Sequence, residues 1–314
     1  MSASAALPHP TPLPGPFRRL HHVGLRVRDP AATASFLRAV AGFEPAAVPS
    51  PFGGAMLLRG RNLYVELEHC PAPGRAADRP VNEAGITHLC LQGPDAARLR
   101  DAALAAGARF HGPLVDLGTG HLYIYGRDPE GNVFEIESVP YADPDEAAWA
   151  AHIAIASPDI DRATAFYGAL LGVPAKPGRT VGPYPALDLI SGLEGVVARP
   201  AWVALDTLQL EIWQYLEPAT GPRADAEDAA PGYAHVGVEV ASVADACRMV
   251  ADLGGCVLDR PPGTVPAALA RDPDGNLIKL VETAAPGRSF SLSHLPDPLL
   301  VARVAERRPG RPAQ

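Results

Sequence analysis

Four residues that can bind a metal ion occupy matching places in two repeated segments of the sequence. His22 and His88 each lie in a short alternating apolar segment, and Glu66 and Glu135 each lie in a later segment of the same kind, 44 and 47 residues downstream. Because side chains alternate along a strand, residues at equivalent positions of two related sheets can face one centre. Two imidazoles and two carboxylates suit one divalent ion, Zn²⁺, Ni²⁺, Co²⁺, Mn²⁺ or Fe²⁺, with positions left for water or substrate.

Each of these residues also has a simpler interpretation. A single histidine on a strand is more often a hydrogen-bonded structural residue than a metal ligand, and Glu66 shares its predicted face with Glu68, an equally good candidate. Four ligand-type residues in register across two repeats are much harder to explain by chance. The joint pattern therefore favours a metal site.

The elements that must position these residues form a unit that occurs four times. The segment LHHVGLRVRDPAATASFLRAVAGF from Leu20 resembles AHIAIASPDIDRATAFYGALLGV from Ala151, and RDPEGNVFEIES from Arg127 resembles RDPDGNLIKLVE from Arg271. Each unit opens with an alternating strand, and an Asp or Ser then caps an amphipathic helix of about ten residues. The Asp-Pro-x-Gly-Asn run predicts a tight turn between two strands. The pattern predicts an α+β fold built by internal duplication.

These segments resemble the vicinal oxygen chelate superfamily, which includes glyoxalase I, extradiol dioxygenases and bleomycin-resistance proteins. The resemblance covers roughly residues 18–283 and rests on HHVGLRVRD, YVELE, ITHLCL and DPEGNVFEIE, and on their counterparts HIAIAS, LQLEIW, YAHVGVEV and DPDGNLIKL. It implies four βαβββ units that form two consecutive open, incomplete β-barrels with helices outside. It also places His22 rather than His21, and Glu66 rather than Glu68, at ligand positions.

We expect the following division of the chain. Residues 18–140 form a first domain with an intact metal site, and residues 150–283 form a second domain with a degenerate one. Residues 1–17 are expected to be a flexible lead, and residues 284–314 a flexible tail with a short helix near 298–306.

The second half departs from the ligand pattern at one position. His152, Glu211 and His235 match, but Lys279 stands where the last carboxylate belongs. An ammonium group cannot bind a metal ion unless it loses its proton, and its charge repels a divalent cation. Glu282 does not replace it, because an offset of three residues points to the opposite face. We expect a degenerate site, or at best a weak one with three ligands.

The four units can pair in two ways. Pairing within halves gives one complete site, made of His22, Glu66, His88 and Glu135. Pairing across halves, as in tandem glyoxalases, gives one complete site of His88, Glu135, His152 and Glu211. The linker from Ser138 to Ala151 suits two sequential barrels, so the sequence favours pairing within halves. His88 and Glu135 belong to the intact site in both schemes.

The leading hypothesis for function is a metal-dependent isomerase, epimerase or lyase of the glyoxalase type, acting on a small carbonyl or vicinal-oxygen substrate through an enediolate. Glu135 or Glu66 would carry the proton. The alternative is an Fe(II)-dependent extradiol-type dioxygenase, with His22, His88 and Glu135 as a facial triad and Tyr125 as its acid–base residue. A third alternative is a non-enzymatic binding or resistance protein that sequesters a small molecule.

Composition limits the partners. The formal net charge of −8 argues against nucleic acid, because phosphate binding needs a positive surface. No stretch approaches the roughly 18 consecutive apolar residues of a membrane span, and the first residues do not read as a signal peptide. The four cysteines show no CxxC pairing, which is typical of a reduced cytoplasmic protein. We expect a cytoplasmic monomer or homodimer with a small-molecule substrate.

Overall fold

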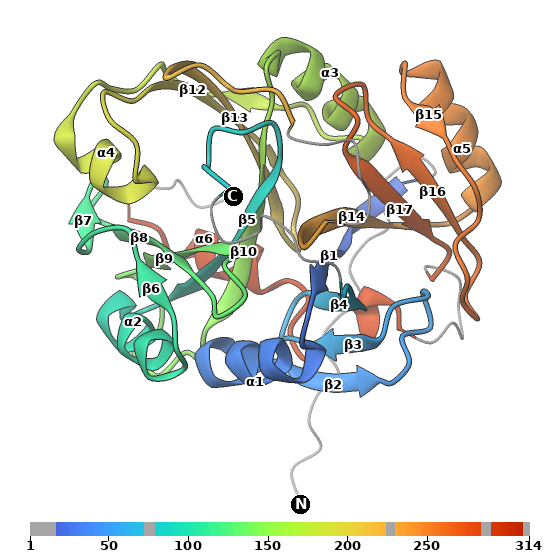
Figure 1. Ribbon diagram of the computed structural model, residues 1–314, viewed down its shortest axis with the longest axis horizontal. Coiled ribbons are helices and arrows are strands. Elements are labelled where there is room, and N and C mark those ends of the chain that lie inside the picture. The colour runs from blue at the N-terminus through green and yellow to red at the C-terminus, as the bar shows by residue number, and fades with distance from the viewer. Residues whose placement is uncertain (1–16, 72–78, 224–229, 284–289, 310–314) are drawn as a thin grey trace, which may run out of the picture.

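The computed structural model describes residues 17–71, 79–223, 230–283 and 290–309. Two curved sheets lie side by side, with helices outside them (Figure 1). Neither sheet closes on itself in the described ranges. The predicted α+β class with four repeated units and two open, incomplete barrels is confirmed. The lead predicted at 1–17 falls, apart from its last residue, outside the described residues.

Each half of the chain contributes two of the four units. The first unit comprises β1 (Phe17–Val27), α1 (Pro30–Ala41), β2 (Glu44–Ala47), β3 (Met56–Arg59) and β4 (Tyr64–His69). The second comprises β5 (Gly85–Gly93), α2 (Ala96–Ala105), β6 (Arg109–Phe110), β7 (Val115–Asp116), β8 (Leu122–Arg127) and β9 (Val133–Ser138). The third comprises β10 (Trp149–Ala156), α3 (Ile160–Leu171), β11 (Lys176–Pro177), α4 (Pro185–Ser191), β12 (Val197–Ala204) and β13 (Gln209–Glu217). The fourth comprises β14 (Gly232–Val240), α5 (Val243–Asp252), β15 (Cys256–Val257), β16 (Ala267–Arg271) and β17 (Leu277–Val281).

Both sheets combine one unit from each half of the chain. The order β15-β16-β17-β14-β1-β4-β3-β2 joins the fourth unit to the first, and β11-β12-β13-β10-β5-β9-β8-β6 joins the third to the second, with β7 beside β8. The joints are the antiparallel pairs β1–β14 and β10–β5. The favoured pairing within halves is therefore wrong, and the pairing across halves is the observed one.

The path of the chain explains this pairing. In every unit the first strand runs parallel to the last, which leaves the other edge of the first strand free. The linker between β9 and β10 has only to pass one intervening strand, β5, for β10 to reach that free edge. Strands lie about 4.8 Å apart, so ten linker residues cover this distance easily. A short linker is therefore compatible with both schemes.

The two units of one half meet through their helices instead. Asp29 caps α1 by accepting hydrogen bonds from the backbone of the first turn, and Gly42 ends the helix in the left-handed conformation. Phe36 of α1 packs against Phe134 of β9 with ring centroids 5.4 Å apart. Helices α1 and α2 lie together at the bottom of Figure 1, and α3 and α5 lie at the top. The main apolar core fills the space between these helices and the sheets.

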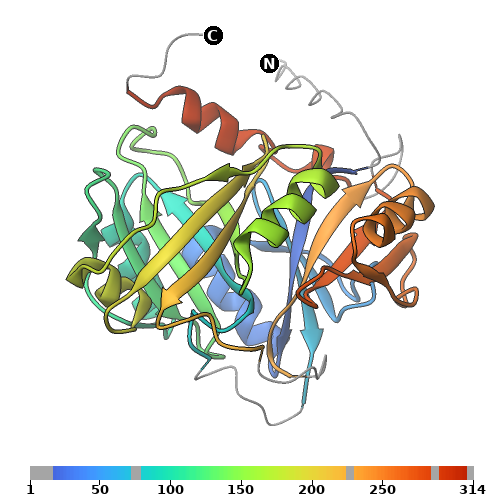
Figure 2. The ribbon, with the colours of Figure 1, turned by 90° about the horizontal axis from the view of Figure 1, so that it is seen from above.

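The C-terminal segment is not a free tail where the structure describes it. Residues 290–309 contain a 3-10 turn at Leu292–His294 and the helix α6 at Leu300–Glu306, drawn in red at the edge of Figure 2. Leu292 and Leu300 are fully buried. Leu300 belongs to a cluster with Trp149, and Leu292 to one with Phe52 and Tyr64. The helix predicted near 298–306 is confirmed, but this part of the chain is packed.

The buried side-chain amide of Asn62 links the two sheets. Asn62, in the turn before β4, is fully buried. Its Nδ2 donates to the backbone oxygens of Ala150 (2.7 Å) and Thr207 (3.0 Å), and its Oδ1 accepts from the Ala150 nitrogen at 3.2 Å. Removing this amide leaves three buried backbone groups without these partners.

We therefore expect Asn62→Ala to lower the free energy of unfolding by about 2–4 kcal/mol, measured by urea denaturation. Asn82→Ala is the matched control. Its Nδ2 makes a similar bond to the Ala219 oxygen at 3.0 Å, but the side chain is half-buried. Water can replace that bond, so the loss should stay below about 1 kcal/mol. Equal effects of the two substitutions would contradict this role of Asn62.

Candidate metal centres

Four ligand-type side chains converge on the inner face of the sheet made by the second and third units. His88 lies on β5, Glu135 on β9, His152 on β10 and Glu211 on β13, which are four neighbouring strands. His152 Nε2 lies 2.8 Å from Glu135 Oε2 and 3.3 Å from Glu211 Oε2. His88 Nε2 lies 3.2 Å and 3.9 Å from the same two oxygens, and the two Nε2 atoms are 3.4 Å apart. We call these four residues the first group.

The first group fits a divalent metal ion. Ligand atoms about 2.0–2.2 Å from a shared ion stand roughly 3–3.5 Å from one another, close to the separations seen here. All four side chains are buried, yet two carboxylates are costly to bury without positive charge. Two imidazole nitrogens and two carboxylate oxygens are ligands suited to Zn, Ni, Co, Mn or Fe(II). The residues present could hold any one of these ions.

Neighbouring side chains orient the first group. Thr87 Oγ1 lies 3.1 Å from His88 Nδ1 and 3.3 Å from the Ala154 oxygen, so it can accept from the ring and donate to the backbone. This contact orients the His88 ring through Nδ1, so that Nε2 faces the other residues of the first group. Trp202 on β12 donates from Nε1 to Glu211 Oε1 at 2.9 Å and fixes that carboxylate. Such partners commonly change metal affinity by about 10–100-fold.

The protonation of the first group reflects its close contacts. Burial alone lowers the pKa of His152, but the carboxylates of Glu211 and Glu135 raise it to about 9. Burial alone raises the pKa of Glu135, but the charge of His152 and hydrogen bonds from His152 and His88 lower it to about 2. Burial and the neighbouring Glu135 raise the pKa of the Cys90 thiol well above its usual range. Without a metal ion, a protonated His152 therefore balances the buried acids.

A second group lies on the corresponding strands of the other sheet. His22 on β1 and His235 on β14 approach each other with Nε2 atoms 3.1 Å apart. Glu66 Oε2 on β4 lies 3.4 Å from His22 Nε2 and 3.2 Å from His235 Nε2. Lys279 on β17 completes the group, with its Nζ 2.6 Å from the same oxygen. All four side chains are buried.

Hydrogen-bond donors outside the second group bind the other carboxylate oxygen of Glu66. Glu66 Oε1 accepts hydrogen bonds from Ser50 Oγ (2.7 Å) and the Gly54 nitrogen (2.8 Å). Burial alone raises the pKa of Glu66, but its bonds to both histidines and the charge of Lys279 hold the pKa well below its usual range. Burial lowers the pKa of His22 well below its usual value. Glu66 is therefore an ionised carboxylate whose partners are already in place.

The predicted four-ligand site does not form. His22 and Glu66 belong to the second group, while His88 and Glu135 belong to the first. The cause is the strand pairing, which places β1 and β4 in one sheet and β5 and β9 in the other. The facial triad of His22, His88 and Glu135 is divided in the same way. The structure instead brings together the four residues of the pairing across halves.

Other predicted and unpredicted residues surround the first group. Tyr125 is buried, and its ring centroid lies 4.6 Å from that of His88. Cys90 and Glu137 form a third ligand-type cluster that shares His152 with the first group. The role of Trp202 in fixing Glu211 was missed, because a strand tryptophan usually belongs to a core.

Two glycines make room for the histidine rings of the second group. A Cβ on Gly237 would lie 2.0 Å from His22 Nδ1, and a Cβ on Gly24 would lie 2.1 Å from the His235 ring. Both rings are fixed by buried neighbours, so neither can move aside cheaply.

We expect Gly237→Ala to lower the free energy of unfolding by about 1–3 kcal/mol, because it overfills this packed centre. Gly221→Ala is a suitable control, since a Cβ there would meet nothing within 4 Å. Urea denaturation of both variants checks this. A Gly237→Ala protein as stable as the control would show that the His22 ring is not held as described.

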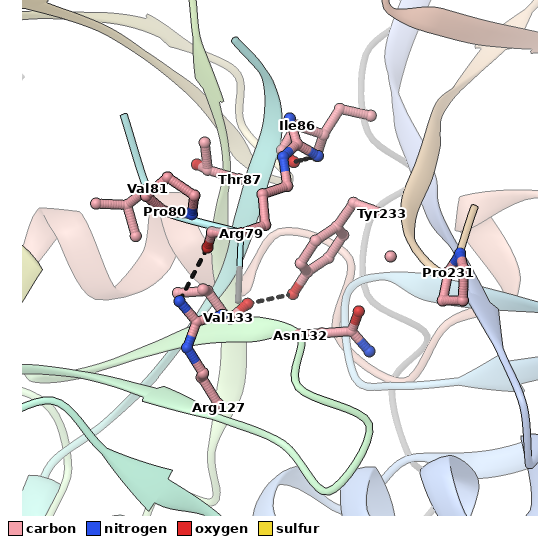
Figure 3. Close-up of a pocket in the computed structure, with 11 residues that line it drawn as sticks. Arg79, Pro80, Val81, Ile86, Thr87, Arg127, Asn132, Val133, Pro231 and Tyr233 are labelled. Atoms are coloured by element: carbon pink, nitrogen blue, oxygen red, sulfur yellow. Dashed lines mark hydrogen bonds between the residues drawn. The ribbon is translucent and has the colours of Figure 1, made fainter. Parts of the chain in front are cut away.

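Two cavities lie near the groups. A crevice of about 20 Å³ opens where the sheets meet, and Tyr233 of β14 crosses it to donate to the Val133 oxygen at 2.8 Å (Figure 3). That volume suits about one water molecule, so it cannot hold a substrate. A larger cavity of about 470 Å³ lies beside the second group and is lined in part by Lys279, Glu68 and Arg26. Arg26 and Glu68 form an ion pair at 2.9 Å there.

Family models match both halves of the chain. The model of the Glyoxalase/Bleomycin resistance protein/Dioxygenase superfamily matches residues 19–136, and that of the Glyoxalase-like domain matches residues 152–281. Together they span well over half of the chain. The chain belongs to the vicinal oxygen chelate superfamily. Members of this superfamily bind a divalent metal ion, and many are enzymes.

Solved structures support the same fold. Glyoxalase I from Zea mays matches with a TM-score of 0.59 and 21% identity, over 88% of this chain and 96% of that chain. A putative dioxygenase from Bacillus subtilis subsp. subtilis str. 168 matches with a TM-score of 0.56 and 14% identity, over 93% and 97%. At these identities the likeness concerns the fold alone. No curated protein matches the chain.

Proposed function

We propose that this vicinal oxygen chelate protein is a metal-dependent lyase or isomerase of the glyoxalase type, which acts on a small carbonyl or vicinal-oxygen compound at the first group. The observation that carries the proposal is the convergence of His88, Glu135, His152 and Glu211, with four donor atoms close enough to share one ion. The second group lacks such a set because Lys279 replaces a carboxylate.

The proposed chemistry uses a carbonyl whose neighbouring carbon loses a proton. A bound divalent ion would polarise that carbonyl and stabilise the enediolate that forms. The chain itself would have to move the proton. Glu211 Oε1 is held by the indole of Trp202, whereas Glu135 Oε2 lies beside the two histidine rings, and the Cys90 thiol is another neighbour of the Glu135 carboxylate. We assign the proton transfer to Glu135 Oε2 on this basis.

Tyr125 has a supporting role in the proposal. Burial and the nearby Glu135 raise the pKa of Tyr125 well above its usual value, so its hydroxyl stays protonated. Together with Tyr215 and Trp213 it belongs to an apolar cluster that also includes Leu187 of α4. These side chains would surround a substrate with apolar surface and limit its contact with water.

The competing functions make different demands on the first group. A dioxygenase needs iron and three open positions beside a facial triad, whereas two histidines with two carboxylates occupy four. A binding protein needs no complete ligand set. The presence of both carboxylates, Glu135 and Glu211, therefore favours the lyase or isomerase.

Metal analysis of protein purified without chelator, followed by two assays, tests the proposal. We expect close to one equivalent of Zn, Ni, Co or Mn, and NMR should show deuterium from solvent entering α-hydroxy or α-keto carbonyl compounds. Iron with oxygen uptake in the presence of catechols would favour the dioxygenase. Protein that binds small carbonyl compounds without any metal would favour the binding protein.

Localisation and assembly stay predictions. None of the four cysteines, all of them within the described ranges, forms a disulfide bond, in keeping with the cytoplasmic location predicted from the sequence. No helix in the described ranges is long and apolar enough to cross a membrane. A monomer or homodimer with a small-molecule substrate is still the expected form.

A further inference from the structure

The second group repeats the first with one change. His22 and His235 correspond to His152 and His88, and Glu66 corresponds to Glu211, each on the equivalent strand. On the last strand, Lys279 of β17 stands where Glu135 stands on β9. The two centres therefore have nearly the same backbone frame and differ in the charge of one side chain.

The ammonium of Lys279 lies inside the set of potential metal ligands. Its Nζ is 2.6 Å from Glu66 Oε2, the oxygen that both histidine rings also face. It further donates to the Phe52 oxygen at 3.3 Å and approaches Glu68 Oε1 at 3.5 Å. These three oxygen neighbours come from β4 and from the loop that contains Phe52, and Lys279 is only 2% exposed.

This placement is incompatible with a divalent ion at the second group. The ion would have to share Glu66 Oε2 with a positive charge at hydrogen-bond distance, and repulsion between like charges is strong in a buried site. If Lys279 swung out, the buried Glu66 carboxylate would lose the positive charge of the ammonium at 2.6 Å. The cavity of about 470 Å³ beside the second group is lined by Lys279 itself, together with Arg26 and Glu68.

We infer that the second group is a metal-free centre in which the Lys279 ammonium takes the place of the ion. The internal cation neutralises Glu66 and ties β17 to β4 across the middle of the sheet, which a metal ion would otherwise do. This sheet should therefore keep its structure when a chelator removes metal from the protein.

Cobalt binding tests the inference, because Co²⁺ in a site with histidine and carboxylate ligands gives visible absorption bands. The starting protein is the full chain with His152→Ala and Glu211→Gln, which dismantle the first group. With Lys279 intact it should bind less than about 0.1 equivalent of Co²⁺ in equilibrium dialysis. Adding Lys279→Glu should raise binding to about one equivalent, and adding His235→Ala to that variant should abolish it again.

The outcomes separate this inference from the proposed function. One equivalent of Co²⁺ bound with Lys279 intact, and lost on substitution of His235, would overturn it. So would a Lys279→Glu variant that keeps the circular dichroism of the starting protein but gains no Co²⁺. If that variant does not fold, Lys279→Gln serves instead, and should show a weak site with three ligands. None of these results depends on whether the first group is catalytic.

Discussion

Replacing Glu135 by Gln should lower kcat/KM for proton exchange by about 10²–10⁴-fold, the usual contribution of a positioned general base. An amide keeps the size of the side chain and an oxygen near His152 and His88, but it cannot accept a proton at neutral pH. The measurement is the rate of solvent deuterium entry into a carbonyl substrate at saturating metal. Metal content must be determined on the same sample, so that loss of the ion is separated from loss of the base.

Glu68→Gln is the matched control for this experiment. Glu68 is a partly exposed carboxylate beside the second group, paired with Arg26 at 2.9 Å. The Glu68→Gln substitution should leave kcat/KM for proton exchange within about twofold of the value for the unmodified protein. A Glu135→Gln protein that is fully loaded with metal and fully active would remove Glu135 from the mechanism and leave Glu211 as the carboxylate of the first group that could move the proton.

The affinity of the first group for a divalent ion should rise about tenfold per pH unit between pH 6.5 and 8.5. The pKa of His152 is raised to about 9 in the metal-free protein, so the ring carries a proton that must leave before Nε2 can bind an ion. Titrations with Zn²⁺ in buffers of different ionisation enthalpy should show about one proton released per ion at pH 7. An affinity independent of pH would contradict the protonated His152.

The same raised pKa sets the sign of a stability change without metal. The charged His152 contributes stability that is fully present below the unfolded value near pH 6.5 and is lost as the pH rises through about 9. The free energy of unfolding of the metal-free protein should therefore fall as the pH rises over this range. This dependence on pH should disappear in the His152→Ala variant. A steady or rising stability in the unmodified protein would count against the ion pair with Glu135.

The sequence predicted the repeated unit well, because the unit depends on local patterns. Alternating strands, Asp caps such as Asp29, and the Asp-Pro-x-Gly-Asn turns are short-range signals, and the observed elements follow them. His88 and Glu135 could be selected as candidate metal ligands because they belong to the complete four-residue set in either pairing of the units.

The pairing itself could not be decided from the sequence. The first strand of each unit has one free edge. That edge of β5 could have paired with β1, within the first half, as readily as with β10, which is its observed partner. Nothing in the strand patterns ranks these choices. The grouping of His22 with His235, and the position of the Lys279 ammonium, follow only once the sheets are assembled.

Anomalous scattering from a crystal grown with Co²⁺ or Zn²⁺ tests the central claim most directly. One strong peak per chain is expected, within about 2.3 Å of the Nε2 atoms of His88 and His152 and of at least one oxygen from Glu135 or Glu211. A peak between His22 and His235, or a loaded protein with no density at the first group, would contradict it.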